Sequence, residues 1–411
     1  MNKLLLPAGC RGWFWRCLLS LVLIGIIAPC PGWALSVHTL GVHDDVTVLE
    51  VSGLYDSMVD GQVDNTPQRE VAKEFLRTHG DQHDFLVVFT NFDFLMPSPS
   101  ARAFFTPVRN DVDGIGIPRF DYSPAFSPTG TPLDRLQGVI DMANLNSHQL
   151  QPTDPGFEET LQILTHELMH RWGAYVGYQG HDGERSERLL CIDRSHWSYL
   201  LDSQGSTLYG NNWQDNQDGT FTTVLPDQVG FGASTGRIFS PLDLYLMGLV
   251  SPDAVPDLLL LNNPGIDAER LPEVGITLAA SAEFVSVEQI IAVEGSRQPT
   301  TDIAPKEFTV GFAYAVLPGT WSADSSAGQA ELAEISRLGN EWKRRFAVLT
   351  DGVGRLVSSP SAEGPIDENP GLAVAVALPA AAIPAVNLGV EWLVAAQDAD
   401  GDWYDQTGIV E

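Results

Sequence analysis

The chain has few basic residues for its length. Its 411 residues include 23 lysines and arginines against 53 aspartates and glutamates, which gives a formal net charge of −30. Neutralising phosphate groups requires basic surface, so this balance argues against a nucleic-acid partner and against attraction to anionic membranes. Charged residues make up 18% of the chain and hydrophobic residues 44%. This composition is typical of a chain that folds around a sizeable core.

Cysteine is scarce as well, and three of the four cysteines fall within the first 30 residues. Basic residues there precede the apolar stretch 18–28, and no acidic residue occurs before Asp44. This stretch is short for a membrane span and suits the hydrophobic region of a signal peptide. Gly32 and Ala34 place small residues where a signal peptidase expects them, so we expect residues 1–34 to be cleaved after export. An uncleaved anchor is the alternative.

The predicted mature chain keeps one cysteine, Cys191, which cannot form an internal disulfide. We expect a secreted, periplasmic or cell-surface protein. Residues 359–370 read as a linker because they are rich in Pro, Gly and acidic residues. Residues 371–390 lack charge, but their prolines and asparagine argue against a membrane span in the mature chain. We therefore interpret 371–411 as a short C-terminal β-type segment without an assigned role.

Strand and helix periodicities are interspersed between residues 35 and 358. Residues 96–134 are rich in Pro, Ser, Gly and Asp, so we expect mostly loop there. The pattern predicts one α+β domain over 35–358, with a mixed sheet and the helix at 155–172 packed against it. Strands are expected at 46–51, 85–89, 136–145 and 308–317, and helices at 67–79, 155–172, 241–249 and 332–346.

The sequence HELMH at residues 166–170 carries the clearest chemical signal. Leu161 and Leu164 mark the core face of the predicted helix that contains it. His166 and His170 are four residues apart, which separates them by about 40° around a helix axis, so both imidazoles can reach one ion. Zn²⁺ prefers imidazole nitrogen in tetrahedral geometry, and a catalytic zinc keeps one position open.

Glu167 stands between these histidines. There it can take a proton from water and pass it to a leaving amine. The alternative interpretation is a solvent-facing helix with two ordinary histidines, which requires no metal.

HELMH on a helix, preceded by a strand in an exported chain, resembles the zincin superfamily of metallopeptidases. The longer series HELMHRW, SHWS and FSPLDLYLMGL is similar to segments of exported bacterial proteins, and the resemblance covers residues 136–249. It implies that His166 and His170 bind zinc and that Glu167 is the general base. It also implies that an edge strand before the helix pairs with the substrate backbone, which makes 136–145 the candidate strand.

The third metal ligand is open between two residues. The metzincin branch has a histidine three residues after the glycine that corresponds to Gly173, and this chain has Val176 there. In the gluzincin branch an acidic residue on a following helix is the ligand, which implies Asp243. An acidic residue in the first turn of a helix is also explained by the helix dipole. His196 is the rival ligand, or a donor to the oxyanion of the transition state, or a structural residue.

Two further features are candidates for binding or catalysis. Tyr245 is a second oxyanion donor or a core residue. Asp398, Asp400 and Asp402 alternate as in the first half of a Ca²⁺-binding loop, although Ile409 stands where that loop would have glutamate. Ca²⁺ is therefore a second candidate cation beside Zn²⁺.

These features predict a zinc-dependent metallopeptidase that acts on protein or peptide substrates. One alternative is a non-catalytic exported protein that binds metal or a partner on a zincin-like scaffold. Another is a zinc amidase that acts on a non-peptide bond. The intact Glu167 argues against the non-catalytic alternative, because a purely structural metal site has no need of a base.

Overall fold

The computed structural model describes residues 35–98, 101–191, 193–225, 238–263, 265–268 and 270–358. The expected signal peptide 1–34, the linker 359–370 and the segment 371–411 lie outside the described residues, and so do Asp398, Asp400 and Asp402. Helices and strands are intermixed along the described chain, as expected for the α+β class. No helix in this part of the chain is long and apolar enough to cross a membrane.

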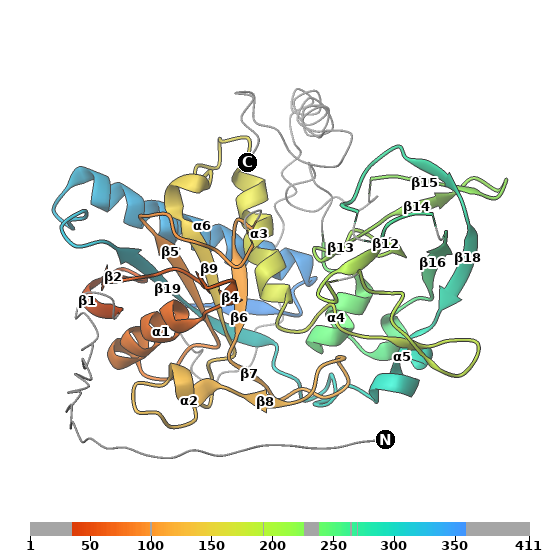
Figure 1. Cartoon of the computed structure of the whole chain (residues 1–411), viewed down its shortest axis with the longest axis horizontal. Helices are drawn as coiled ribbons and strands as arrows, with labels where there is room; N and C mark the ends of the chain where they lie inside the picture. Colours follow the sequence, from red (N-terminus) through yellow and green to blue (C-terminus); the bar gives the residue numbers. More distant parts are fainter. Residues whose placement is uncertain are drawn as a thin grey trace, which may run out of the picture. The chain divides into compact units, whose positions relative to one another are not determined.

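A mixed seven-stranded sheet combines strands from the first and the last parts of the described chain (Figure 1). Its strands follow the order β1-β2-β19-β5-β9-β6, and β20 also pairs with β19. Strands β2, β19, β5 and β9 are mutually parallel, while β1 and β6 run antiparallel at the two edges. The bounds are β1 (Ser36–His43), β2 (Val46–Ser52), β5 (Phe85–Thr90), β6 (Phe104–Pro107), β9 (Gly138–Asn144), β19 (Glu307–Val316) and β20 (Arg355–Val357).

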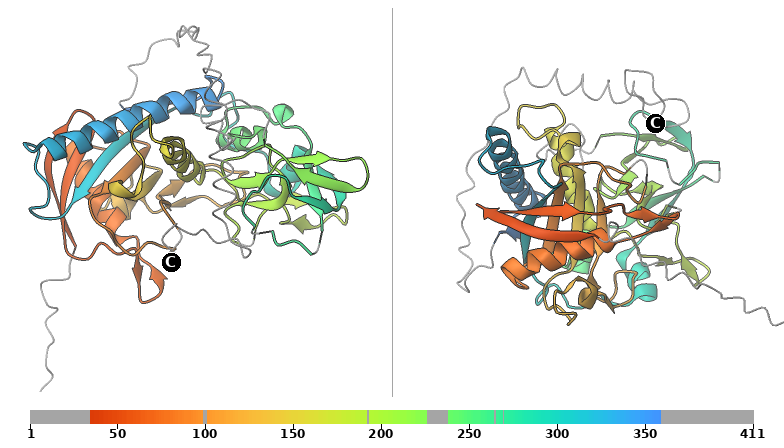
Figure 2. Two further views of the ribbon diagram at one scale, coloured as in Figure 1. Left: turned by 90° about the horizontal axis from the view of Figure 1, so that it is seen from above. Right: turned by 60° about the vertical axis from the view of Figure 1, so that its left-hand side comes forward.

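Helices cover both faces of this sheet (Figure 2). Strand β5 shows why, because all six of its residues are buried and successive side chains enter opposite cores. Phe85, Val87 and Phe89 pack with α3 (Phe157–Met169) and α6 (Ser326–Leu349). Leu86 and Val88 pack with α1 (Thr66–His79) and α2 (Ser123–Phe126). The predicted central strand at 85–89 is confirmed.

Smaller sheets and two short helices occupy the chain between α3 and β19. A four-stranded sheet has the order β13-β12-β16-β18 and a three-stranded sheet the order β14-β15-β17 within the described residues. Hairpins β3-β4, β7-β8 and β10-β11 stand apart from these sheets. The bounds are β3 (Met58–Val59), β4 (Gln62–Val63), β7 (Arg109–Asn110), β8 (Phe120–Asp121), η1 (Leu145–Ser147), β10 (Tyr178–Gln179), β11 (Arg185–Ser186), β12 (Trp197–Asp202), β13 (Tyr209–Asn211), β14 (Trp213–Asp215), β15 (Thr220–Thr223), α4 (Pro241–Met247), η2 (Pro252–Ala254), β16 (Leu258–Asn262), β17 (Thr277–Ala279), β18 (Ser281–Val285) and α5 (Val287–Glu294).

One expectation for the segment before α3 is confirmed and one is wrong. The described residues of 96–134 are mostly loop, as expected, and include three short strands and the short helix α2. The strand at 136–145 was the expected edge strand, but β9 lies between β5 and β6, so the edge strand is β6. The burial of β9 explains the difference, because six of its seven residues are buried and an edge strand would expose more.

A buried carboxylate links β9 to α1. Asp141 is fully buried and accepts hydrogen bonds from Tyr55 Oη at 3.0 Å, Gln68 Nε2 at 2.8 Å and the backbone N–H of Ala143 at 2.9 Å. Burial raises the pKa of Asp141 to about 6, although these hydrogen bonds oppose the increase. The folded protein therefore holds a proton here between about pH 4 and pH 6 that the unfolded chain has released.

We predict that the free energy of unfolding of Asp141→Asn will rise relative to wild type as the pH increases from 4.5 to 6.5. The gain is about 2 kcal/mol, because wild type must bury a charge as Asp141 ionises and asparagine does not titrate. Urea unfolding of both proteins at the two pH values measures it. A difference that stays constant between pH 4.5 and 6.5 would contradict the prediction.

Candidate metal centre

Helix α3 brings the HELMH residues to the boundary between the large sheet and the smaller ones. Leu161, Leu164 and Leu168 are buried in the core, while His166 and His170 are only partly buried. His170 ends the helix as its C-cap and its backbone N–H donates to the carbonyl of His166. The two imidazoles therefore leave the core face of the helix, as the periodicity predicts.

Three histidines converge at this point. The Nε2 atom of His166 lies 3.1 Å from His170 Nε2 and 3.2 Å from His196 Nε2. The ligand atoms of the three side chains all lie within 4.8 Å of one another. Two nitrogens that bind one zinc at about 2.0–2.1 Å in tetrahedral geometry stand roughly 3.4 Å apart, so the observed spacing fits a single zinc.

In His166 and His196 the second ring nitrogen, Nδ1, lies within hydrogen-bond distance of an oxygen acceptor. His166 Nδ1 lies 2.7 Å from the carbonyl oxygen of Thr207, and His196 Nδ1 lies 2.6 Å from Asp193 Oδ2. Both acceptors favour the tautomer with hydrogen on Nδ1, which leaves the Nε2 lone pair for a metal. Burial, together with the neighbouring His166 and His196, lowers the pKa of His170 well below its usual value. A neutral imidazole is the form that binds metal.

Asp193 organises the loop that presents His196. Besides His196 Nδ1, its carboxylate accepts from the backbone N–H of Ser195 at 2.8 Å and from the thiol of Cys191, also at 2.8 Å. Although burial opposes it, hydrogen bonds from His196 and Cys191 hold the pKa of Asp193 below its usual value. Asp193 is therefore an anion that orients the imidazole. No short motif links Asp193 to His196, so the sequence alone does not predict this role.

Glu167 is buried beside the histidines and faces the edge strand β6. Its side chain is 7% exposed, and burial raises its pKa to about 8. The backbone N–H of Phe105 donates to its carboxylate and opposes the increase. A cation bound by the histidines would favour the ionised carboxylate further. Proton exchange near neutral pH is the chemistry that such a carboxylate can carry out.

Tyr209 covers one side of the histidine group and was missed by the sequence analysis. Its ring stacks on His196 with 4.7 Å between ring centroids, and lies 5.0 Å from the ring of His166. The residue has a φ of 76°, a conformation rare outside glycine. The segment around it has no periodicity, so only the structure reveals its place.

Among the described residues, Asp243 and Tyr245 lie outside the group formed by the three converging histidines. Asp243 is fully buried and forms a capping box at the start of α4, where it accepts from the backbone N–H of Ser240 at 2.9 Å. It also accepts from Trp197 Nε1 at 3.2 Å, so it anchors the residue that follows His196. The Tyr245 hydroxyl accepts from the backbone N–H of Arg297 at 3.4 Å inside the core.

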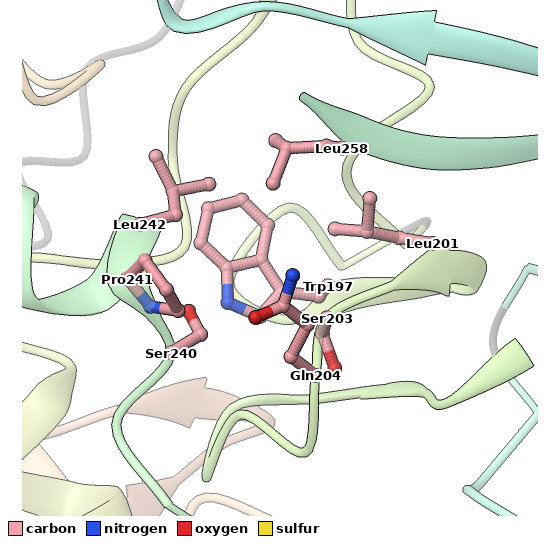
Figure 3. A pocket seen from close by; sticks show the side chains of 8 residues that line it. All are labelled: Trp197, Leu201, Ser203, Gln204, Ser240, Pro241, Leu242 and Leu258. Atoms are coloured by element: carbon pink, nitrogen blue, oxygen red, sulfur yellow. The ribbon is translucent and has the colours of Figure 1, made fainter. Parts of the chain in front are cut away.

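Figure 3 shows the cavity beside Trp197, whose indole lies between Pro241 and Leu242 on one side and Leu201 and Leu258 on the other. The volume of this cavity is about 10 Å³. Such a space holds no more than about one water molecule, so it is a packing gap rather than a binding site. The small volume also shows that Trp197, the residue after His196, is closely packed.

Comparisons with protein-family models, with curated proteins and with solved structures found no match to this chain. The interpretation of the centre therefore depends on the geometry of its own residues.

We predict that His166→Ala and His196→Ala will each abolish stoichiometric zinc binding, because two remaining ligands hold the ion poorly. Asp243→Asn is the matched comparison and should retain about one zinc per chain, because Asp243 lies outside the histidine group. Asparagine also keeps the shape of the aspartate side chain. Metal analysis after exhaustive dialysis measures the content. Loss of zinc in Asp243→Asn with retention in His196→Ala would reverse the assignment of the third ligand.

Asp193→Asn is expected to weaken zinc binding by about 10–100-fold, because a neutral amide orients His196 less strongly. Competition with a chromophoric chelator measures the affinity. Asp182→Asn provides a control, since Asp182 lies on an exposed turn and accepts a local bond from the N–H of Glu184. Equal affinities in Asp193→Asn and wild type would show that the hydrogen bond does not support the ligand.

Proposed function

We propose that the protein is an exported, zinc-dependent hydrolase of peptide bonds. The observation that carries the proposal is the convergence of His166, His170 and His196 beside the buried Glu167. Structural zinc sites usually have four protein ligands, whereas catalytic sites have three and keep one position for water or substrate. Three imidazoles next to a carboxylate match the catalytic arrangement.

Each residue of the centre has a distinct role in this reaction. Zinc, when bound, supplies Lewis acidity that lowers the pKa of water and polarises the scissile carbonyl. Glu167 accepts a proton from the attacking water and delivers it to the leaving amine nitrogen. The carbonyl of Thr207 and the carboxylate of Asp193 keep two of the imidazoles oriented. Tyr209 packs over these rings and limits the access of solvent to them.

The position of β6 supports an extended peptide as substrate. Among the described strands it pairs with β9 alone, and its residue Phe105 directs its backbone N–H to Glu167. A free strand edge can bind an extended chain through backbone hydrogen bonds. A substrate chain aligned along β6 would pass the general base and the histidines. A non-peptide amide would gain nothing from this edge, so the geometry favours a peptidase over an amidase.

Cleavage of a peptide library by the zinc-loaded protein tests the proposal. We predict that Glu167→Gln will lower kcat by about 10²–10⁴-fold while zinc content and thermal stability are retained, because the amide cannot accept the proton. Glu159→Gln, on the exposed start of the same helix, should keep wild-type activity.

Two results would contradict the proposed function. The first is full activity of Glu167→Gln, which would remove the general base from the mechanism. The second is the absence of cleavage of any library peptide by zinc-loaded wild type.

A further inference from the structure

We propose that a pocket beside His170 binds the substrate side chain next to the scissile bond, selects large apolar or aromatic side chains and excludes lysine and arginine. The proposal deepens the peptidase function above and depends on it. Its basis is the position, size, lining and charge of the pocket.

The pocket shares residues with the metal centre on two sides. It lies between β6, the β7–β8 hairpin and the end of α3, and its open volume is about 210 Å³. His170 lines it, and the Nε2 atom of this residue lies 3.1 Å from that of His166. Phe105 lines it too and donates its backbone N–H to Glu167. One residue of extended chain spans about 3.3 Å, so a substrate held at Glu167 has an adjacent side chain at this pocket.

The size and lining of the pocket suit a ring. Phe105, Ile117 and Phe120 form its apolar wall, and each is only partly buried. An apolar cavity of about 150 Å³ is enough to bind benzene, so about 210 Å³ accepts a phenyl group. Burying a side chain the size of leucine or phenylalanine corresponds to a preference of about 10–100-fold over glycine.

The charged wall of the pocket disfavours a cationic side chain. Arg109 and Arg171 both line it and share one carboxylate, with Arg109 Nη2 3.3 Å from Asp111 Oδ2 and Arg171 Nη2 3.1 Å from Asp111 Oδ1. Arg171 is almost fully buried, and its other donors bond Gln137 Oε1 and Asn110 Oδ1. Two guanidinium groups with one counterion leave a positive wall, which repels lysine and arginine.

The walls are held in place by two glycines. A Cβ atom at Gly138 would lie 2.2 Å from the ring of Phe105, so this ring lies directly over the glycine. Gly116 has a φ of 85°, and a Cβ atom there would lie 2.2 Å from the carbonyl oxygen of Tyr175. These close approaches fix β6 and the loop before Ile117 against their neighbours. The pocket is therefore formed before any substrate binds.

Ile117→Trp fills the pocket and tests the proposal. Ile303→Trp is the matched control, because Ile303 is 72% exposed and is not part of the pocket lining. The first measurement is binding of N-acetyl-phenylalanine amide and N-acetyl-lysine amide to the zinc-loaded full chain by NMR. We expect the phenylalanine amide to bind wild type and the control alike and Ile117→Trp at least 10-fold more weakly. The lysine amide should not bind any of them. Binding of the phenylalanine amide that is indifferent to Ile117→Trp, or preferred binding of the lysine amide, overturns the proposal.

The second measurement is kcat/KM for a peptide series that varies only the residue next to the scissile bond. Ile117→Trp should lower the ratio for phenylalanine against glycine by about 10–100-fold and keep its zinc. Phe120→Ala, which enlarges the pocket, should shift the preference towards tryptophan. Equal use of glycine and phenylalanine by wild type overturns the proposal. If no peptide is cleaved while the phenylalanine amide binds in the Ile117-dependent manner, the peptidase function fails and the ligand class of the pocket stands.

Discussion

The position of His196 depends on one carboxylate, that of Asp193. One oxygen of Asp193 accepts from His196 Nδ1, while the other accepts from the backbone of Ser195 and from the thiol of Cys191. The same group thus shapes the loop and orients the imidazole. On the other side of His196, Trp197 is fixed by its bond to Asp243. The Asp193 carboxylate therefore gives the third histidine its direction, and the first two histidines alone would leave the metal site one ligand short.

The large sheet provides the other half of the centre through packing. Alternate residues of β5 serve two cores, so the sheet is buried on both faces and α3 is pressed against it. Strand β9 is covered by β6, so among the described residues β6 is the strand at this edge of the sheet, and it lies against Glu167. The surroundings of Glu167, the edge strand and the pocket at Phe105 therefore depend on one strand order.

Local sequence patterns predicted the elements whose residues interact with near neighbours. The helix at 67–79, the buried strand at 85–89 and the helix with HELMH follow from apolar spacing and are present. Strand β6 was missed because it has four residues and ends at Pro107, which resembles a loop. Tyr209 lies in a segment without periodicity, so its contact with His196 is purely tertiary.

The choice between Asp243 and His196 shows the same limit. An acidic residue three positions after Ser240 has the spacing of a capping box, and this is the role Asp243 has in the fold. The sequence therefore supported two roles for Asp243, a helix cap and a zinc ligand as in gluzincins. Local spacing alone could not decide between them. His196 follows an irregular segment whose length says nothing about distance in space. The tertiary arrangement of β12 and β13 brings His196 to α3.

The separation of His170 and His196 along the chain has a consequence for stability. The two residues are 26 positions apart, and an ion held by both would close that segment into a loop. By analogy with a disulfide that closes a loop of this length, such a cross-link removes conformational freedom from the unfolded chain worth about 3–4 kcal/mol. In the described region Cys191 is a free cysteine. A metal ion bound by the imidazoles would therefore provide the kind of cross-link that a disulfide provides in other proteins.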